Sequence, residues 1–133
     1  MLGSADLIRP MLEKTRDSYN VDAISQALGR AAIGDRPYAA DTWRQVRAAR
    51  QSLAAGLTRL GFMVEPSQTN FLLARVAGQA PRSAQELYAY LKNQRILVRH
   101  FPTPRLDDCL RISVGTPTQN QRLIAALGEA LHD

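Results

Sequence analysis

Two stretches decide the fold of this chain: Arg95-Ile96-Leu97-Val98-Arg99-His100-Phe101 and Cys109-Leu110-Arg111-Ile112-Ser113-Val114-Gly115-Thr116. Runs of this apolar, partly β-branched kind predict strands. The proline and aspartate residues between them are typical of a segment that turns the chain back. Alternation of side chains places Arg111 off the apolar face of the second strand, and puts Arg99 and Phe101 on one face of the first.

An arginine lies inside each predicted strand, Arg99 in the first and Arg111 in the second. If the hairpin is centred near Arg105, Arg99 lies opposite Arg111. Like charges at opposite positions destabilise a sheet, so the pair is best explained by a carboxylate or phosphate bound between the two guanidinium groups. The alternative, which the spacing alone favours because surface arginines are common, is that both arginines are solvated or paired internally. The candidate internal partners are Asp107, Asp108 and Glu65.

Further elements are predicted around the hairpin. They are a long helix capped by Asp41 and ended by Gly61, strands at 62–65 and 69–76, a helix opened by a capping box at Ser83–Glu86, and a last helix opened by a capping box at Thr116–Gln119. The order helix, strand, strand, helix, strand, strand, helix predicts an α+β fold. We expect a two-layer domain, with a mostly antiparallel sheet and helices on one face.

Apolar stripes are predicted on the helices of the first half of the chain. A short helix is expected over 4–14 with an interruption near Pro10, and a second stripe runs along 21–31, before a break at 34–37. The stripe of the long helix is expected to pack into the core. Its members are Trp43, Val46, Leu53, Leu57 and Leu60.

Five segments carry a resemblance to a known family. They are DSYNVDAISQAL (17–28), SQTNFLLARV (67–76), QRILVRHF (94–101), CLRISVGT (109–116) and TQNQRLIAAL (118–127). In this order they resemble the C-terminal part of histidinol-phosphate aminotransferases, which are fold-type I, class I/II enzymes dependent on pyridoxal phosphate. The resemblance implies that Arg111 and Arg99 bind the acidic group of the substrate, which is the phosphate of histidinol phosphate or, in relatives, a carboxylate. It also implies a cytoplasmic homodimer that transfers an amino group between histidinol phosphate and 2-oxoglutarate in histidine biosynthesis.

The sequence departs from this family at the residues that perform the chemistry. Such a transaminase binds pyridoxal phosphate through a lysine in a Ser-x-x-Lys context, whereas this chain has only Lys14 and Lys92, both in polar helical settings. It also has no glycine-rich turn before a helix to hold the cofactor phosphate. We therefore expect 1–36 to be a helical remnant of the large, cofactor-binding domain and 37–133 to be the small domain. We assign no catalytic residue and no covalently bound cofactor to this chain, and expect it to be inactive alone.

Other functions are compatible with the same residues. A freestanding module for small anions would use the arginine pair without a cofactor, and a dimerisation module would use the apolar faces of 21–33 and of the long helix. Aromatic-amino-acid aminotransferases and threonine-phosphate decarboxylases resemble this C-terminal pattern as well. Within the family resemblance, Tyr19 and Asn20 are expected near the active site or the partner subunit, and Asn70 there or at a strand start.

Composition argues against several other classes. The 133 residues carry a net charge of +5, but 15 of the 17 basic residues are arginines dispersed among acidic ones, which is not typical of a nucleic-acid surface. No apolar run reaches membrane-span length and no signal peptide opens the chain, so a cytosolic protein is expected. With Cys109 as the single cysteine, we expect no disulfide and no metal cluster. Cys109 and His100 are expected to have structural roles.

Overall fold

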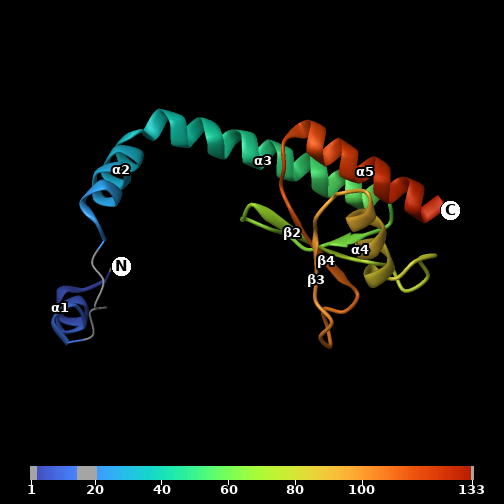
Figure 1. The fold of residues 1–133 in the computed structure, drawn as a ribbon, viewed down its shortest axis with the longest axis horizontal. Helices are drawn as coiled ribbons and strands as arrows, with labels where there is room; N and C mark the ends of the chain where they lie inside the picture. The colour runs from blue at the N-terminus through green and yellow to red at the C-terminus, as the bar shows by residue number, and fades with distance from the viewer. Residues whose placement is uncertain (1–2, 15–20, 133) are drawn as a thin grey trace. The chain divides into compact units, whose positions relative to one another are not determined.

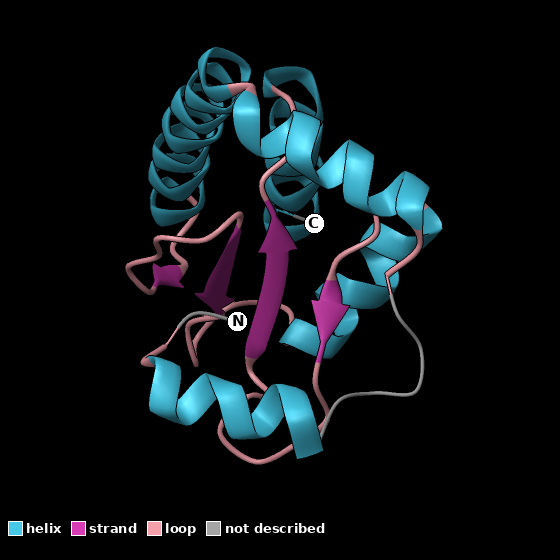
Figure 2. Cartoon of the chain, turned by 90° about the vertical axis from the view of Figure 1, so that its left-hand side faces the viewer, coloured by secondary structure: helices cyan, strands magenta, loops and turns pink. Residues whose placement is uncertain are grey.

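A four-stranded antiparallel sheet forms the centre of the C-terminal half (Figure 1). In the computed structural model, which describes residues 3–14 and 21–132, the strands are β1 (Met63–Val64), β2 (Phe71–Arg75), β3 (Arg99–His100) and β4 (Cys109–Ser113). They lie in the order β1-β2-β4-β3. Figure 2 shows the short arrow of β3 beside the long arrow of β4 at the edge of the sheet.

Three helices complete this half: α3 (Arg36–Arg59), α4 (Ala84–Asn93) and α5 (Pro117–His132). Their apolar residues pack on the sheet face formed by alternate residues of β2 and β4. The fully buried side chains of this core include Leu53, Leu57, Leu72, Leu87, Leu91, Leu110, Ile112 and Leu127. The predicted two-layer α+β fold, with helices on one face of an antiparallel sheet, is confirmed.

Both predicted capping boxes are present. The Ser83 N–H donates to the Glu86 carboxylate (2.7 Å), and the Glu86 N–H donates to the Ser83 hydroxyl oxygen (3.3 Å). At α5 the Thr116 N–H donates to the Gln119 side-chain oxygen (2.9 Å), and the Gln119 N–H donates to the Thr116 hydroxyl oxygen (3.3 Å). Reciprocal bonds of this kind satisfy donors that a helix N-terminus leaves free.

The start of α3 was predicted wrongly. The helix begins at Arg36 and not after Asp41, because the Asp35 carboxylate accepts the Tyr38 N–H (3.2 Å) as a cap, and Pro37 is tolerated in the first turn, where a backbone donor has no helical partner. Asp41 lies inside the helix and forms an ion pair with Arg44.

Trp43 was also predicted wrongly as a core residue. Its side chain is 63% exposed, whereas Leu53 and Leu57 on the same helix are buried. Trp43 and Leu53 are ten positions apart, which is about 15 Å along the helix. The apolar stripe of α3 is therefore longer than the part of the helix that packs on the sheet, and Trp43 lies outside that part.

Residues 1–39 form a separate compact unit, and residues 40–133 form the other. In the first unit α1 (Ala5–Lys14) continues through Pro10, so the predicted interruption is wrong; the helix lacks only the hydrogen bond that Pro10 cannot donate. The second helix, α2 (Ala23–Gly34), is capped by Asp22, whose carboxylate accepts the Ser25 N–H (2.9 Å). The domain boundary at 36/37 concerns a longer parent protein and stays a prediction. Tyr19 and Asn20 lie outside the described residues.

Several large apolar side chains are exposed in α2, just before it and at the start of α3. They are Val21, Ile24, Leu28, Ile33 and Tyr38. None of the helices that the structure describes is long and apolar enough to cross a membrane.

Candidate functional site

The face of the sheet opposite the core carries the candidate site. Leu72 of β2 and Leu110 and Ile112 of β4 point into the core. Side chains alternate along a strand, so the residues next to these three in β2 and β4 point to the other face. On that face Arg111 pairs with Leu73 of β2 on one side and with Arg99 of β3 on the other. The predicted cross-strand register of Arg99 and Arg111 is confirmed.

Two phenylalanine rings hold the arginine pair. The Arg99 Cζ lies 5.2 Å from the centre of the Phe101 ring, and the Arg111 Cζ lies 5.7 Å from the same centre. Phe71, at the start of β2, contacts Arg111 at 5.3 Å. Guanidinium groups that stack on rings keep their N–H edges free to bind an anion. Both arginine side chains are exposed, and among residues 3–14 and 21–132 neither forms an ion pair.

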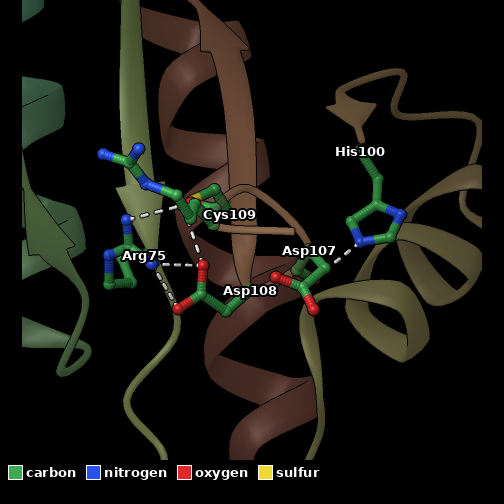
Figure 3. Close-up of polar contacts among 6 residues, drawn as sticks. Arg75, His100, Asp107, Asp108 and Cys109 are labelled. Carbon is green, nitrogen blue, oxygen red and sulfur yellow. Dashed lines mark hydrogen bonds and ion pairs between the residues drawn. The ribbon is translucent and has the colours of Figure 1, made fainter. Parts of the chain in front are cut away.

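One aspartate that could have paired with these arginines has another partner. Asp108 forms an ion pair with Arg75, at the end of β2 (Figure 3). This hydrogen-bonded guanidinium holds the pKa of Asp108 below its usual value, and the same pairing raises the pKa of Arg75. The backbone carbonyl oxygen of Asp107 lies 2.8 Å from Nε2 of His100, which is on the face opposite Arg99. His100 therefore has the structural role that was predicted for it.

Cys109 is buried beside this ion pair. Its thiol donates to the Asp108 carboxylate (3.2 Å), and burial raises the pKa of the thiol to about 11. A thiol with so high a pKa is protonated at neutral pH and is a poor nucleophile. Within the described residues no cluster of three or more histidine, cysteine, aspartate or glutamate side chains could hold a metal ion.

Asn70 precedes β2, and its carbonyl oxygen accepts the Val114 N–H (2.8 Å). This contact extends the pairing of β2 and β4 by one residue, so it supports the strand start. A groove of about 860 Å³ lies elsewhere in the C-terminal unit, between α3 and the start of α5. Small side chains such as Ala49 and Gly56 line it. It contains neither arginine of the pair.

Known proteins resemble this chain over most of its length. The model of the family "Aminotransferase class I and II" matches residues 2–127, nearly the whole chain. The chain belongs to the class I and II aminotransferase family. It spans about a third of the length of the curated relatives that it matches, 34% in one case and 36% in another.

Two curated relatives of this aminotransferase chain share a description. Histidinol-phosphate aminotransferase of Microcystis aeruginosa is 43% identical over 90% of the chain, and histidinol-phosphate aminotransferase 1 of a Nostoc species is 44% identical over 98%. Among solved structures, histidinol-phosphate aminotransferase of Sinorhizobium meliloti in complex with pyridoxal-5'-phosphate superposes with a TM-score of 0.79 at 25% identity. That match covers 92% of this chain and 33% of the other.

Neither lysine of this chain matches the Schiff-base lysine of an enzyme that binds pyridoxal phosphate. Lys14 and Lys92 are both exposed on the surfaces of helices α1 and α4, and neither follows the Ser-x-x-Lys pattern. A lysine that forms a Schiff base lies in a desolvated pocket or beside another cationic group, whereas both of these side chains are exposed. These two lysines therefore do not account for covalent binding of pyridoxal phosphate.

Proposed function

We propose that this chain is the C-terminal, substrate-binding part of a longer histidinol-phosphate aminotransferase, in which Arg111 and Arg99 bind the acidic group of the substrate. One observation carries the proposal. Two exposed guanidinium groups lie at opposite positions of β3 and β4, share the Phe101 ring, and have no acidic partner in the described part of the chain.

The physical argument rests on repulsion between these two groups. Like charges at directly opposite positions of a sheet destabilise it, so an anion between them removes a penalty as well as forming new bonds. Each guanidinium presents a planar fork of donors that matches a carboxylate or phosphate. Bound in this way, the acidic end of the substrate is fixed, and the rest of the molecule is oriented toward the groups that react with it.

The family membership supports an enzyme of the transaminase kind, and the curated relatives support histidinol phosphate as its substrate. Pyridoxal phosphate, which supplies the amino-transfer chemistry in this family, is assigned to a part of the parent enzyme that this chain does not contain. A cytoplasmic homodimer belongs to the same proposal. Trp43 and the apolar side chains of α2 are exposed here, and we assign them to contacts with the rest of that enzyme.

Titration with inorganic phosphate tests the anion site on the chain as it stands. Chemical-shift changes of ¹⁵N-labelled protein at constant ionic strength should map to β3 and β4, and Arg111→Gln should weaken the binding by about tenfold or more, because charge-assisted bonds contribute about 1.5–3 kcal/mol. Arg44→Gln is the matched control, since it removes the same charge from α3. Equal affinities of the Arg111 and Arg44 variants would contradict the proposed site.

The parent enzyme is tested separately. An antibody against this chain should detect a polypeptide about three times as long in the source organism, as the coverage of the relatives indicates. That protein should transfer the amino group of histidinol phosphate to 2-oxoglutarate, whereas the 133-residue chain should not. A native product of 133 residues would overturn the proposal of a longer enzyme but would leave the anion site standing.

A further inference from the structure

The loop that joins the two arginine strands is held by a residue outside the hairpin. Arg75, at the end of β2, forms the ion pair with Asp108 and donates to the carbonyl oxygen of Arg105 (3.3 Å), so it binds this loop at two points (Figure 3). We propose that Arg75 is a positioning residue for the anion site, which holds the loop in the conformation that keeps Arg99 opposite Arg111. This inference rests on the proposed function of the arginine pair.

Strand β3 needs such support because its own pairing is small. It has two residues, lies at the edge of the sheet, and pairs with β4 only at Arg99↔Arg111 and His100↔Leu110. One of these two pairs places like charges opposite each other, which weakens it. An edge strand with so short a ladder has a weakly specified position. The conformation of the connecting loop therefore has a large influence on where Arg99 lies.

The loop has its own strain, and Arg75 acts at that point. Arg105 has φ 74°, a left-handed conformation that is unfavourable for a residue with a Cβ. The Arg75 guanidinium bonds to the carbonyl oxygen of this residue, and the Val76 N–H donates to the carbonyl oxygen of Asp108 (2.9 Å). On the other side of the loop His100 contacts the carbonyl oxygen of Asp107. The loop is thus fixed to β2 at one side and to β3 at the other.

Arg75 also determines which partner the carboxylate of the loop residue Asp108 has. Asp108 is the acidic residue closest in sequence to Arg111, and a free carboxylate at this position could occupy the anion site from within the chain. Arg75 engages Asp108 in an ion pair, which lowers the pKa of this carboxyl. The guanidinium of Arg75 is in turn occupied, so it does not compete for the substrate anion.

Two opposite charge changes test the inference. Arg75→Gln and Asp108→Asn each break the same contact, but the first lowers the net charge of the protein by one and the second raises it by one. A purely coulombic effect would weaken phosphate binding in Arg75→Gln and strengthen it in Asp108→Asn. A positioning role predicts weaker binding in both, by about tenfold, because misplacement of a binding group by about 1 Å has effects of this size or larger.

The reversed pair Arg75→Asp/Asp108→Arg should restore binding to within about threefold, as expected for a contact and not for a site-specific charge. Arg44→Gln and Asp41→Asn are the matched controls, because they break the ion pair on α3 with the same charge changes. Melting temperatures measured in parallel separate a local effect from unfolding. If Arg75→Gln does not fold, Asp108→Asn alone decides between the two explanations. The positioning role predicts weaker phosphate binding in this variant, and a purely coulombic effect predicts stronger binding.

The outcomes separate this inference from the proposed function. If Arg111→Gln abolishes phosphate binding while Arg75→Gln and Asp108→Asn leave it unchanged or shift it in opposite directions, the positioning role is overturned and the anion site stands. If Arg111→Gln leaves phosphate binding unchanged, the anion site and the positioning role fall together. Weaker binding in both loop variants, with recovery in the reversed pair, supports the inference.

Discussion

Replacement of Phe101 by leucine should weaken anion binding more than the same replacement at Phe71. The Phe101 ring contacts both guanidinium groups, at 5.2 Å and 5.7 Å, whereas the Phe71 ring contacts Arg111 alone, at 5.3 Å. An exposed cation–π contact contributes about 0.5–1 kcal/mol. Phe101 therefore contributes about 1–2 kcal/mol to holding the arginine pair in place, and Phe71 about half of that.

In the Phe101→Leu variant the anion must order both arginine side chains itself, so the lost contacts appear as lost affinity. We expect the dissociation constant for phosphate to rise by about 5- to 30-fold for Phe101→Leu and by about 2- to 5-fold for Phe71→Leu. The assay is a phosphate titration followed by chemical shifts, with circular dichroism to show that both variants melt as the unaltered chain does. Equal effects of the two variants, or none, would refute the view that the shared ring preorganises the pair.

Three further predictions concern stability. Leu110→Ala should lower the free energy of unfolding by about 2–5 kcal/mol in urea denaturation, because Leu110 is fully buried between the arginine face and the helices. Arg95→Gly should raise the melting temperature by about 4 °C, because Arg95 has φ 58° in the turn that ends α4, and glycine adopts this conformation without strain. The bond from Arg75 lowers the folded-state pKa of Asp108 from 3.8, so its stabilisation is present above pH 3.8 and is lost as the pH falls through the folded-state pKa. Melting temperatures of the unaltered chain and Asp108→Asn should therefore converge at acidic pH.

The parts of the fold that sequence predicts well are those with local causes. The capping boxes at Ser83 and Thr116 depend on residues three positions apart, and the alternation in β4 depends on neighbours two positions apart. The hairpin register followed from the centre of a short loop, near Arg105. Each of these patterns can be recognised without knowledge of the rest of the chain.

The features that were predicted wrongly or not predicted depend on information that a local sequence pattern does not hold. Asp35 and Asp41 are both good cap residues, so a local pattern is compatible with either. In the structure Asp35 caps the helix, and Asp41 lies inside it and pairs with Arg44. The ion pair of Arg75 and Asp108 joins residues 33 positions apart, so it depends on the pairing of β2 with β4. Phe71 contacts Arg111 through the same pairing. Phe71 lies on the same face of the sheet as Arg111 and diagonally opposite it, next to the directly paired Leu73. This contact could have been predicted only if the register between β2 and β4 had been known.

In the proposed longer enzyme, the kinetic effect of Arg111 depends on which states of the bound substrate this side chain would contact. A guanidinium that binds the acidic group with equal strength in the ground state and the transition state contributes uniform binding, so its loss should raise KM and leave kcat unchanged. Two guanidinium groups that share one ring form a rigid clamp, and a rigid clamp also orients the far end of the substrate. Its loosening should therefore lower kcat as well.

Arg111→Gln tests the effect on KM and Phe101→Leu the effect on kcat, because Phe101→Leu keeps both charges and removes only the surface that holds them. A Phe101→Leu enzyme with raised KM and unchanged kcat would limit the role of the arginine pair to substrate capture.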